Sequence, residues 1–588
     1  MYQFSNATTF AAVSVLALTA GAATFAQSNS NQAPLDSATL GQQVTVSPIR
    51  DDLVAIMQQD APAEVASFYA DRDYQPLFLA NEAEVARSVI DALDQQRLHA
   101  LPEWPDRLQS LSRHVAAALD GDVTAEGELA FANAFIALGK SRLAGVVVPT
   151  RLSEDMHVFP PEIAASDLLS DLAAVANATR HIMDLAPDHP DYQPLLALRT
   201  KLEEVVSRGG WGAADIPSGS SVAAGERDSR VPAIRARLAA LGDIEGPTAS
   251  RSVQAVVTNA LDDTPLDGQP LQQAVVNSAP SNANLMDDAT VAALKEFQIR
   301  HGLNDDGVVG PKTLAALNTT ADERLRQVLV NLERVRWTDW DRNEKHIYVN
   351  LPDYRMFLRE GGEELFTTRV VIGQPRHQTV EFSDTMTHLV VNPTWTVPRS
   401  IATEEILPTL RNNPNYLNEQ NMTLIDDGSG VWTPPDSSMI NWANFSQSYF
   451  PWWIRQGPGA NNALGNVKFM FPNQFAIYLH DTPSRSLFSR DARAFSHGCV
   501  RVADPVGLTE ALLSPQTSDP LADFQRYRST GRETTVNLES RPAVHLDYRT
   551  VWIDQSGQVQ YRDDVYGRDE LVLDAMEQLG VRVGLPQG

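Results

Sequence analysis

The sequence contains a single cysteine, Cys499, among its 588 residues. One thiol cannot form an internal disulfide, and it cannot supply a Cys-x-x-Cys metal site. Cys499 is therefore a buried inert residue, one half of an intermolecular link, or a reactive thiol. Composition alone leaves these three alternatives open.

Basic residues are also scarce, because 47 Lys and Arg stand against 74 Asp and Glu and give a formal net charge of −27. An electrostatic field of that sign repels phosphate backbones, so we expect no nucleic-acid partner. Hydrophobic residues make up 43% of the chain and charged residues 21%. That composition is typical of a folded protein, and the length allows about four domains at roughly 150 residues each.

Long apolar runs are missing except near the N-terminus, at residues 10–25. This run is rich in small residues, and Thr24 and Ala26 supply the small side chains that a signal peptidase requires. The pattern predicts a signal peptide at 1–26 and an exported protein, although the residues before the run include no Lys or Arg. A membrane anchor is less favoured because the run is shorter than the roughly 20 residues of a spanning helix. Membrane association stays open.

The first half of the mature chain has a helical pattern. Residues 27–50 are rich in Ser, Asn and Gln and predict a flexible leader. Apolar residues recur at helical spacing over 51–225, which predicts a helical scaffold domain. We expect the charges of this domain to lie on solvated faces.

The second half combines helical and strand patterns. Residues 226–320 predict a small helical module, and 321–343 predict a helical connector. Short β-branched and aromatic runs over 344–570 predict a mainly β domain, in which 404–464 form an insertion. An insertion of that length is more often a functional lid than filler. With a C-terminal helix at 571–588, the fold class is multidomain α+β.

Aromatic side chains crowd the insertion. We expect them to form a small core of the insertion itself rather than to stack directly on sugars. They are Trp432, Trp442, Tyr449, Phe450, Trp452 and Trp453.

Polar residues and glycine gather most densely around Cys499. The chain has only 12 histidines, and His480 and His497 lie within 20 positions of the cysteine. An imidazole can take the proton of a thiol or lower its pKa, and thereby make it a nucleophile. Gly498 allows a close backbone approach, so the N–H groups of Gly498 and Cys499 can form an oxyanion site.

Two neighbouring residues complete this pattern. The backbone carbonyl or the carboxylate of Asp481 can fix the tautomer of His480, and the planar guanidinium of Arg501 can bind a substrate carboxylate. A buried cysteine beside a hydrogen-bonded histidine remains an alternative. A metal site is disfavoured, because one Cys with two His leaves it a ligand short and no His-Glu-x-x-His motif is present. We expect neither a metal nor a cofactor.

These residues carry a family resemblance. His480, fifteen intervening residues and the run Ser496-His497-Gly498-Cys499-Val500-Arg501 resemble the signature of the L,D-transpeptidases, whose catalytic domain is of the YkuD type. Residues 478–483 and 391–398 resemble the stretch around the first histidine and the strand that lines the site. Residues 294–318 resemble a peptidoglycan-binding module. The order of scaffold, module and catalytic domain with a long insertion is similar to that of the large Gram-negative L,D-transpeptidases.

The resemblance implies a role for each residue of the signature. Cys499 is the nucleophile, His480 is the general base, and His497 and Gly498 help to shape the oxyanion site. Residues that would support or bind the substrate are Arg501, Ser496, Asp481, Tyr478 and Trp395.

The implied reaction belongs to cell-wall organisation and the maintenance of cell shape in the periplasm. Cys499 would be acylated by a peptidoglycan tetrapeptide stem with release of D-alanine, and a second stem would accept the acyl group in a 3→3 cross-link. Water as acceptor gives an L,D-carboxypeptidase, and a lipoprotein–peptidoglycan link is another substrate that stays open. A non-catalytic wall-binding scaffold is disfavoured because Cys499 and His480 are both present. Carbapenems are the expected covalent inhibitors, and other cell-wall enzymes are an open expectation as partners.

Overall fold

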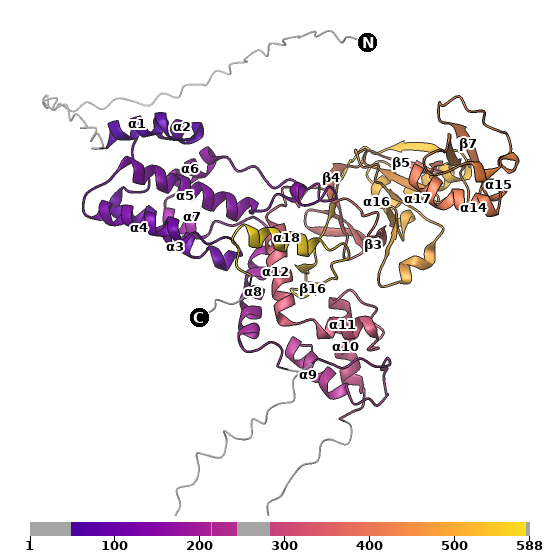
Figure 1. The fold of residues 1–588 in the computed structure, drawn as a ribbon, viewed down its shortest axis with the longest axis horizontal. Coiled ribbons are helices and arrows are strands. Elements are labelled where there is room, and N and C mark those ends of the chain that lie inside the picture. The colour runs from indigo at the N-terminus through magenta and orange to yellow at the C-terminus, as the bar shows by residue number, and fades with distance from the viewer. Residues whose placement is uncertain (1–48, 213–214, 244–282, 584–588) are drawn as a thin grey trace, which may run out of the picture. The chain divides into compact units, whose positions relative to one another are not determined.

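The computed structural model describes residues 49–212, 215–243 and 283–583 (Figure 1). The predicted signal peptide and nearly all of the predicted leader lie outside these residues. Within the described ranges, no helix is long and apolar enough to cross a membrane.

Residues 50–207 form helices, as the spacing of apolar residues predicted. The longest of them, α5, begins after Thr124, whose hydroxyl accepts a hydrogen bond from the Gly127 N–H and caps the first turn. Phe131 and Phe135 of α5 pack against Phe78 in the core. The bounds are α1 (Arg50–Gln59), α2 (Ala63–Asp71), α3 (Glu84–Asp94), α4 (Pro105–Leu119), α5 (Ala125–Ala144), α6 (Ala165–Ala174), α7 (Ala178–Met183) and α8 (Tyr192–Ser207).

The charges of this helical region do not all lie on solvated faces, so that expectation was wrong. Glu128 is buried, and its carboxylate accepts hydrogen bonds from the Tyr69 hydroxyl and from the Phe78 N–H. Arg142 is buried as well and donates to the carbonyl of Ala92. Glu128 thereby satisfies backbone in the loop between α2 and α3, and Arg142 satisfies a carbonyl in the last turn of α3. Apolar spacing does not reveal either need.

The small helical module consists of α9 (Val231–Leu241), α10 (Asp288–Arg300) and α11 (Pro311–Asn318). Its core includes Phe297, and the Asp287 side chain caps α10. Ile216 and Val222 pack into the same core, so the core reaches further toward the N-terminus than residue 226.

The connector is the helix α12 (Ala321–Val335), which begins with a capping box between Thr320 and Glu323. It packs against α8 and against the C-terminal helix α18 (Arg568–Gln578) (Figure 1). The C-terminal helix therefore begins at Arg568, three residues before the predicted start at residue 571.

The second half is built on a sheet of eleven strands, with order β13-β5-β9-β10-β12-β3-β2-β1-β14-β4 and β11 paired to β3 in the described part of the chain. Helix α16 (Pro505–Leu513) packs against β3 and helix α17 (Pro520–Ser529) packs against β5. Outside this sheet, β15 (Val551–Ile553) pairs with β16 (Val559–Tyr561). The strands of the large sheet are β1 (His346–Asn350), β2 (Arg355–Glu360), β3 (Glu363–Gly373), β4 (Phe382–Thr385), β5 (His388–Val391), β9 (Val467–Met470), β10 (Leu479–His480), β11 (Ala494–Ser496), β12 (Val500–Val502), β13 (Thr534–Asn537) and β14 (Ala543–Asp547).

One strand is much shorter than the sequence pattern suggested. Residues 475–480 are one of the apolar and aromatic runs that predict the β domain, and the run favours a continuous strand, but only Leu479 and His480 pair with neighbours. Ala476 lies in the left-handed region at φ 55°, which interrupts an extended strand.

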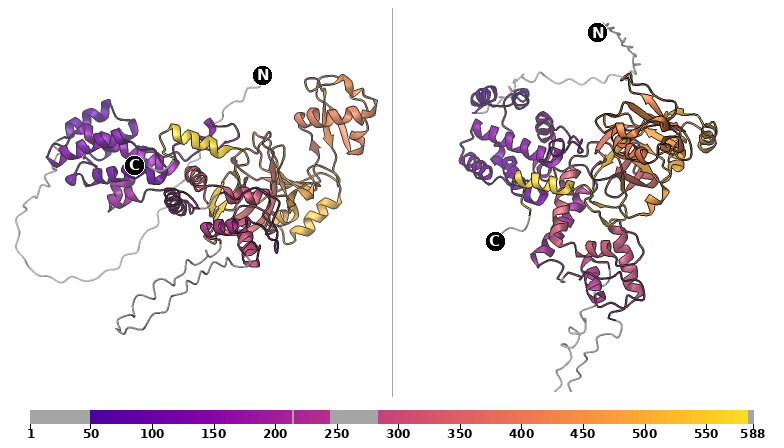
Figure 2. Two further views of the ribbon diagram at one scale, coloured as in Figure 1. Left: turned by 60° about the horizontal axis from the view of Figure 1, so that its bottom comes forward. Right: turned by 45° about the vertical axis from the view of Figure 1, so that its right-hand side comes forward.

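The insertion forms a lobe with its own sheet, ordered β6-β8-β7 (Figure 2). The sheet and core begin before residue 404, because β6 (Trp395–Thr396) and Val397 contribute to them. Other elements are α13 (Arg399–Ile401), a π-helical turn η4 (Ala402–Ile406), α14 (Leu407–Asn412), α15 (Tyr416–Glu419), β7 (Met422–Asp426) and β8 (Trp452–Gln456).

The expectation that aromatic residues build this lobe's core is confirmed for half of them. Trp442, Phe450 and Trp452 are buried and pack on one another at centroid distances of 5.9–6.1 Å. Trp432, Tyr449 and Trp453 are instead exposed.

Replacement of a buried aromatic residue should unfold this lobe preferentially. We expect Trp452→Ala to cost about 3–5 kcal/mol, because it removes a large side chain from a packed core. Limited proteolysis followed by mass spectrometry should show new cleavage within the insertion. Trp432→Ala is the matched control, since Trp432 is 68% exposed. Equal protease resistance in the two variants would contradict this account of the core.

Candidate active site

The pairing of two short strands brings the predicted residues together. In β10 and β12, which run parallel, Leu479 lies opposite Val500 and His480 lies opposite Arg501. Paired residues point to the same face of a sheet and successive residues alternate, so Leu479 and Val500 face the core. His480 and Arg501 therefore lie on the other face, and Tyr478 and Cys499 directly precede the two strands. Tyr478 joins this group by its contacts, because its ring lies 5.7 Å from the His480 ring and its hydroxyl hydrogen-bonds Cys499. The sequence singled out all four residues.

Cys499 is partly buried and directly precedes β12, and its thiol lies 3.8 Å from the Ala476 carbonyl oxygen. Burial raises the pKa of this thiol, whereas hydrogen bonds from the backbone and hydroxyl of Tyr478 and the charge of Arg501 oppose the shift. Burial has the largest effect, so the pKa of Cys499 stays above its ordinary value and the group is a neutral thiol at pH 7.

His480 is buried, and its Nδ1 lies 2.5 Å from the carbonyl oxygen of Asp481. Burial, aided by the charge of Arg501, lowers the pKa of His480 to about 3. The ring is therefore neutral at pH 7. A carbonyl oxygen only accepts, so Nδ1 carries the proton and Nε2 keeps its lone pair.

The carboxylate of Asp481 is occupied by hydrogen bonds to residues other than His480. Oδ2 accepts hydrogen bonds from the backbone and side-chain nitrogens of Asn466 at 2.8 and 3.0 Å, and Oδ1 accepts from the Thr482 N–H and from Arg485. The group that Asp481 presents to His480 is thus its backbone carbonyl, the first of the two possibilities that the sequence left open.

The loop before the cysteine is held by its own side chains. The Ser496 hydroxyl donates to the Cys499 carbonyl oxygen at 2.5 Å and accepts from the Gly498 N–H at 3.2 Å. Gly498 has φ 105°, a conformation that residues with a Cβ rarely adopt. Because it donates to the Ser496 hydroxyl, the Gly498 N–H is already engaged within the loop.

His497 contacts the insertion. Its Nε2 lies 2.8 Å from Oε1 of Glu405, which belongs to the π-helical turn η4, and its ring stacks on His377 at 4.7 Å. Burial lowers the pKa of His497, and the charge of Glu405 partly offsets this. Glu405 and His377 lie far from the cysteine in the chain, so local spacing gave no sign of them.

The remaining predicted residues occupy different places. Arg501 is partly buried, and within the described chain its Nε has no hydrogen-bond partner. Trp395 pairs with Gln456 in the small sheet of the insertion and packs against that lobe's core. Sequence reasoning missed Lys468, which lies opposite His480 on β9, with its Nζ 5.8 Å from the Tyr478 ring centroid.

A separate cavity of about 680 Å³ lies over β1 and β2, lined by residues such as Tyr348, Phe357 and Arg342. None of the predicted site residues lines it.

Residues 344–517 match the family described as the L,D-transpeptidase catalytic domain, YkuD. The chain carries an L,D-transpeptidase catalytic domain. Residues 63–198 match the family described as "Scaffold domain", and residues 273–317 match "Putative peptidoglycan binding domain". The recognised family and the multidomain α+β fold class are thus confirmed.

A relative from Haemophilus influenzae named "Putative L,D-transpeptidase" is 34% identical over 226 residues, which are 38% of this chain and 45% of the relative. This chain therefore matches less than half the length of that relative. A solved L,D-transpeptidase (residues 123–326) from Xylanimonas cellulosilytica aligns with 56% of this chain and 99% of its own, at 13% identity and a TM-score of 0.17. At that TM-score, the alignment carries no structural argument.

The catalytic domain should contain a thiol that is protonated at neutral pH. We expect alkylation of Cys499 by iodoacetamide to accelerate about tenfold per pH unit from pH 6 to 8, because only the thiolate reacts. Mass spectrometry of quenched samples gives the rate, and Cys499→Ala is the control for other adducts. A plateau below pH 8 would instead indicate a preformed thiolate.

The contact between Glu405 of the insertion and His497 of the loop before Cys499 should be visible in the titration of His497. Loss of the negative charge in Glu405→Gln should lower the pKa of His497 further, because Glu405 stabilises the imidazolium. NMR titration of the imidazole measures the shift. Glu404→Gln is the matched control, since Glu404 belongs to the same turn but bonds Gln447. The same titration curve in both variants would contradict the contact.

Proposed function

We propose that this protein is an L,D-transpeptidase that joins peptidoglycan stem peptides through a thioester on Cys499. One observation carries the proposal: Cys499 directly precedes β12, which pairs with the strand of His480, and the His480 tautomer leaves Nε2 free to accept a proton. The catalytic-domain match supports the same reaction class.

In the acylation step, the Cys499 sulfur attacks the carbonyl carbon that precedes the terminal D-alanine of a tetrapeptide stem. Nε2 of His480 takes the thiol proton as the C–S bond forms, because the thiol and imidazole are both neutral at rest. Collapse of the tetrahedral intermediate breaks the C–N bond, and the imidazolium returns its proton to the leaving amine of D-alanine. A thioester remains on Cys499.

The oxyanion of that intermediate needs hydrogen-bond donors. The Cys499 N–H and the Tyr478 hydroxyl are the donors we assign, since the Gly498 N–H already bonds Ser496 and Tyr478 hydrogen-bonds the thiol. Donors fixed before the reaction stabilise developing charge without reorganisation.

Two cationic side chains suit the acidic stem. Arg501 has a partly buried guanidinium whose Nε lacks a hydrogen-bond partner among the described residues, so it can bind a stem carboxylate, and Lys468 adds positive charge on the same face. Ser496 supports the loop before Cys499. Trp395 would contribute to substrate binding by holding the insertion in place, since it packs against the core of that lobe.

The acceptor decides the product. An amine of a second stem gives a 3→3 cross-link, and water gives an L,D-carboxypeptidase. The Glu405–His497 contact supports a lid that excludes water from the thioester. Cleavage of a lipoprotein–peptidoglycan link is the other alternative. The peptidoglycan-binding match supports a cell-wall location, and export by residues 1–26 remains a prediction.

Purified protein incubated with disaccharide-tetrapeptide tests this function. We expect loss of D-alanine and a cross-linked dimer by mass spectrometry, with no product from Cys499→Ala. His480→Ala should slow acylation more at neutral pH than at high pH, where hydroxide forms the thiolate. Incubation with a carbapenem should give a covalent adduct on Cys499.

Each other outcome indicates a different function. Tripeptide without dimer indicates the hydrolase, and release of a lipoprotein from sacculi indicates the third activity. No adduct and no product indicate a wall-binding scaffold and overturn the enzyme assignment.

A further inference from the structure

A buried threonine holds the peptide group next to the cysteine. The Thr379 hydroxyl donates to the Gly498 carbonyl oxygen at 2.8 Å and accepts from the Gly373 N–H at 2.9 Å. Thr379 is fully buried. Its single hydroxyl proton is committed to Gly498, because the Gly373 N–H occupies the acceptor side.

This bond sets the direction of the neighbouring N–H. The Gly498–Cys499 peptide is planar and trans, so its C=O and N–H point in opposite directions. With the carbonyl held by Thr379, the Cys499 N–H points away from residues 378–381. Glycine suits this position, because a Cβ on residue 498 would lie 3.3 Å from the Gln378 carbonyl oxygen and the φ of 105° is one that other residues rarely adopt.

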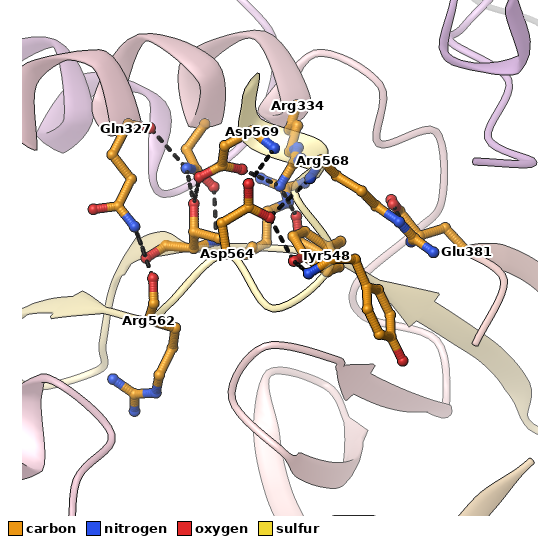
Figure 3. A network of polar contacts seen from close by, with 12 residues as sticks. Gln327, Arg334, Glu381, Tyr548, Arg562, Asp564, Arg568 and Asp569 are labelled. Atoms are coloured by element: carbon orange, nitrogen blue, oxygen red, sulfur yellow. Dashed lines mark hydrogen bonds and ion pairs between the residues drawn. The ribbon is translucent and has the colours of Figure 1, made fainter. Parts of the chain in front are cut away.

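Thr379 is itself held by the first residue of α18. The buried Arg568 guanidinium donates to the Thr379 carbonyl oxygen at 2.9 Å and to the Gln378 side chain at 2.8 and 3.1 Å. It also forms an ion pair with the buried Glu381 at 2.5 Å, and Figure 3 shows its side chain extending toward this carboxylate. A single guanidinium thus fixes residues 378–381.

A tyrosine from the same C-terminal segment adds a second support. The Tyr566 hydroxyl donates to the Gly373 carbonyl oxygen at 2.7 Å and accepts from the Thr379 N–H at 3.2 Å. Thr379 therefore has its N–H, its carbonyl and its hydroxyl all bonded.

The start of α18 is anchored in turn to the sheet and to α12 (Figure 3). Asp564 accepts from the Arg568 N–H at 2.9 Å and from the Tyr548 hydroxyl at 2.6 Å. Asp569 forms an ion pair with Arg334 of α12 at 2.9 Å. The network of hydrogen bonds and ion pairs that supports the loop before Cys499 thus extends to α18 and α12.

We propose that Thr379 is a positioning residue for acyl transfer, which aims the Cys499 N–H at the oxyanion, and that Arg568 acts through Thr379. The inference rests on the proposed function in one respect only: it takes the Cys499 N–H as an oxyanion donor. It requires no particular natural substrate.

Two reagents separate positioning from general damage to the site. p-Nitrophenyl acetate acylates a cysteine through an oxyanion, with release of p-nitrophenol, whereas iodoacetamide alkylates it by displacement of iodide without one. Thr379→Val should slow acylation of Cys499 about tenfold or more, as loss of a supporting hydrogen bond commonly does. Alkylation and its pH profile should remain within about twofold of wild type.

Two further variants complete this comparison. Thr379→Ser restores the hydroxyl and should recover the acylation rate. Thr509→Val is the matched control, because Thr509 is equally buried but donates to the Pro505 carbonyl inside α16. Acylation and alkylation that fall together in Thr379→Val, or a serine variant that does not recover, would overturn the inference.

A double-mutant cycle tests the role of Arg568. Arg568→Lys keeps the charge but loses the planar fork, and it should slow acylation in the wild-type background. In the Thr379→Val background it should have little further effect, because residues that act through one another are not additive. Fully additive effects in proteins with the same melting temperature would show that Arg568 does not act through Thr379.

These outcomes are distinguishable from failure of the proposed function. A protein that acylates with p-nitrophenyl acetate but is inert toward tetrapeptide loses the proposed function and keeps this inference. A wild-type Cys499 that iodoacetamide alkylates but p-nitrophenyl acetate does not acylate overturns the inference.

Discussion

The parallel pairing of β10 with β12 is the constraint on which the site depends. Only Leu479 and His480 of β10 take part, and their register against Val500 and Arg501 puts the proposed nucleophile and the proposed base on one face. A shift of one residue would turn these side chains to the opposite face. Leu479 and Val500 resist such a shift, because both are fully buried in the core beneath the site.

Burial then determines the charge state of the two reacting groups. It raises the pKa of the Cys499 thiol and lowers that of His480, so each is neutral at pH 7. In the proposed acylation, charge separation is therefore delayed until a carbonyl carbon is present to accept the sulfur. A neutral thiol is also oxidised more slowly than a thiolate, because oxidants react with the thiolate.

Local features of the sequence foretold much of this arrangement. The Cys499 and His480 spacing pointed to the family, and the β-branched and aromatic runs predicted a mainly β domain in the second half. The extent of β10 could not be foretold, since the apolar run at 475–480 also fits a strand and only the backbone at Ala476 interrupts it. Several residues reach the site from distant segments of the chain: Glu405, Lys468, Thr379 and Arg568. They could not be foretold, because a pattern read along the sequence does not reveal which distant residues meet.

The Arg568–Glu381 pair has a consequence for what counts as a domain. The match to the catalytic family ends at residue 517, yet β13, β14 and α18 all follow it in the chain. Two of these are strands of the large sheet, and the third supplies the cation that neutralises a buried carboxylate. A chain truncated after residue 517 would expose sheet edges and leave Glu381 uncompensated. The part of the chain that completes this fold is thus longer than the segment that matches the family, and it extends at least to the start of α18.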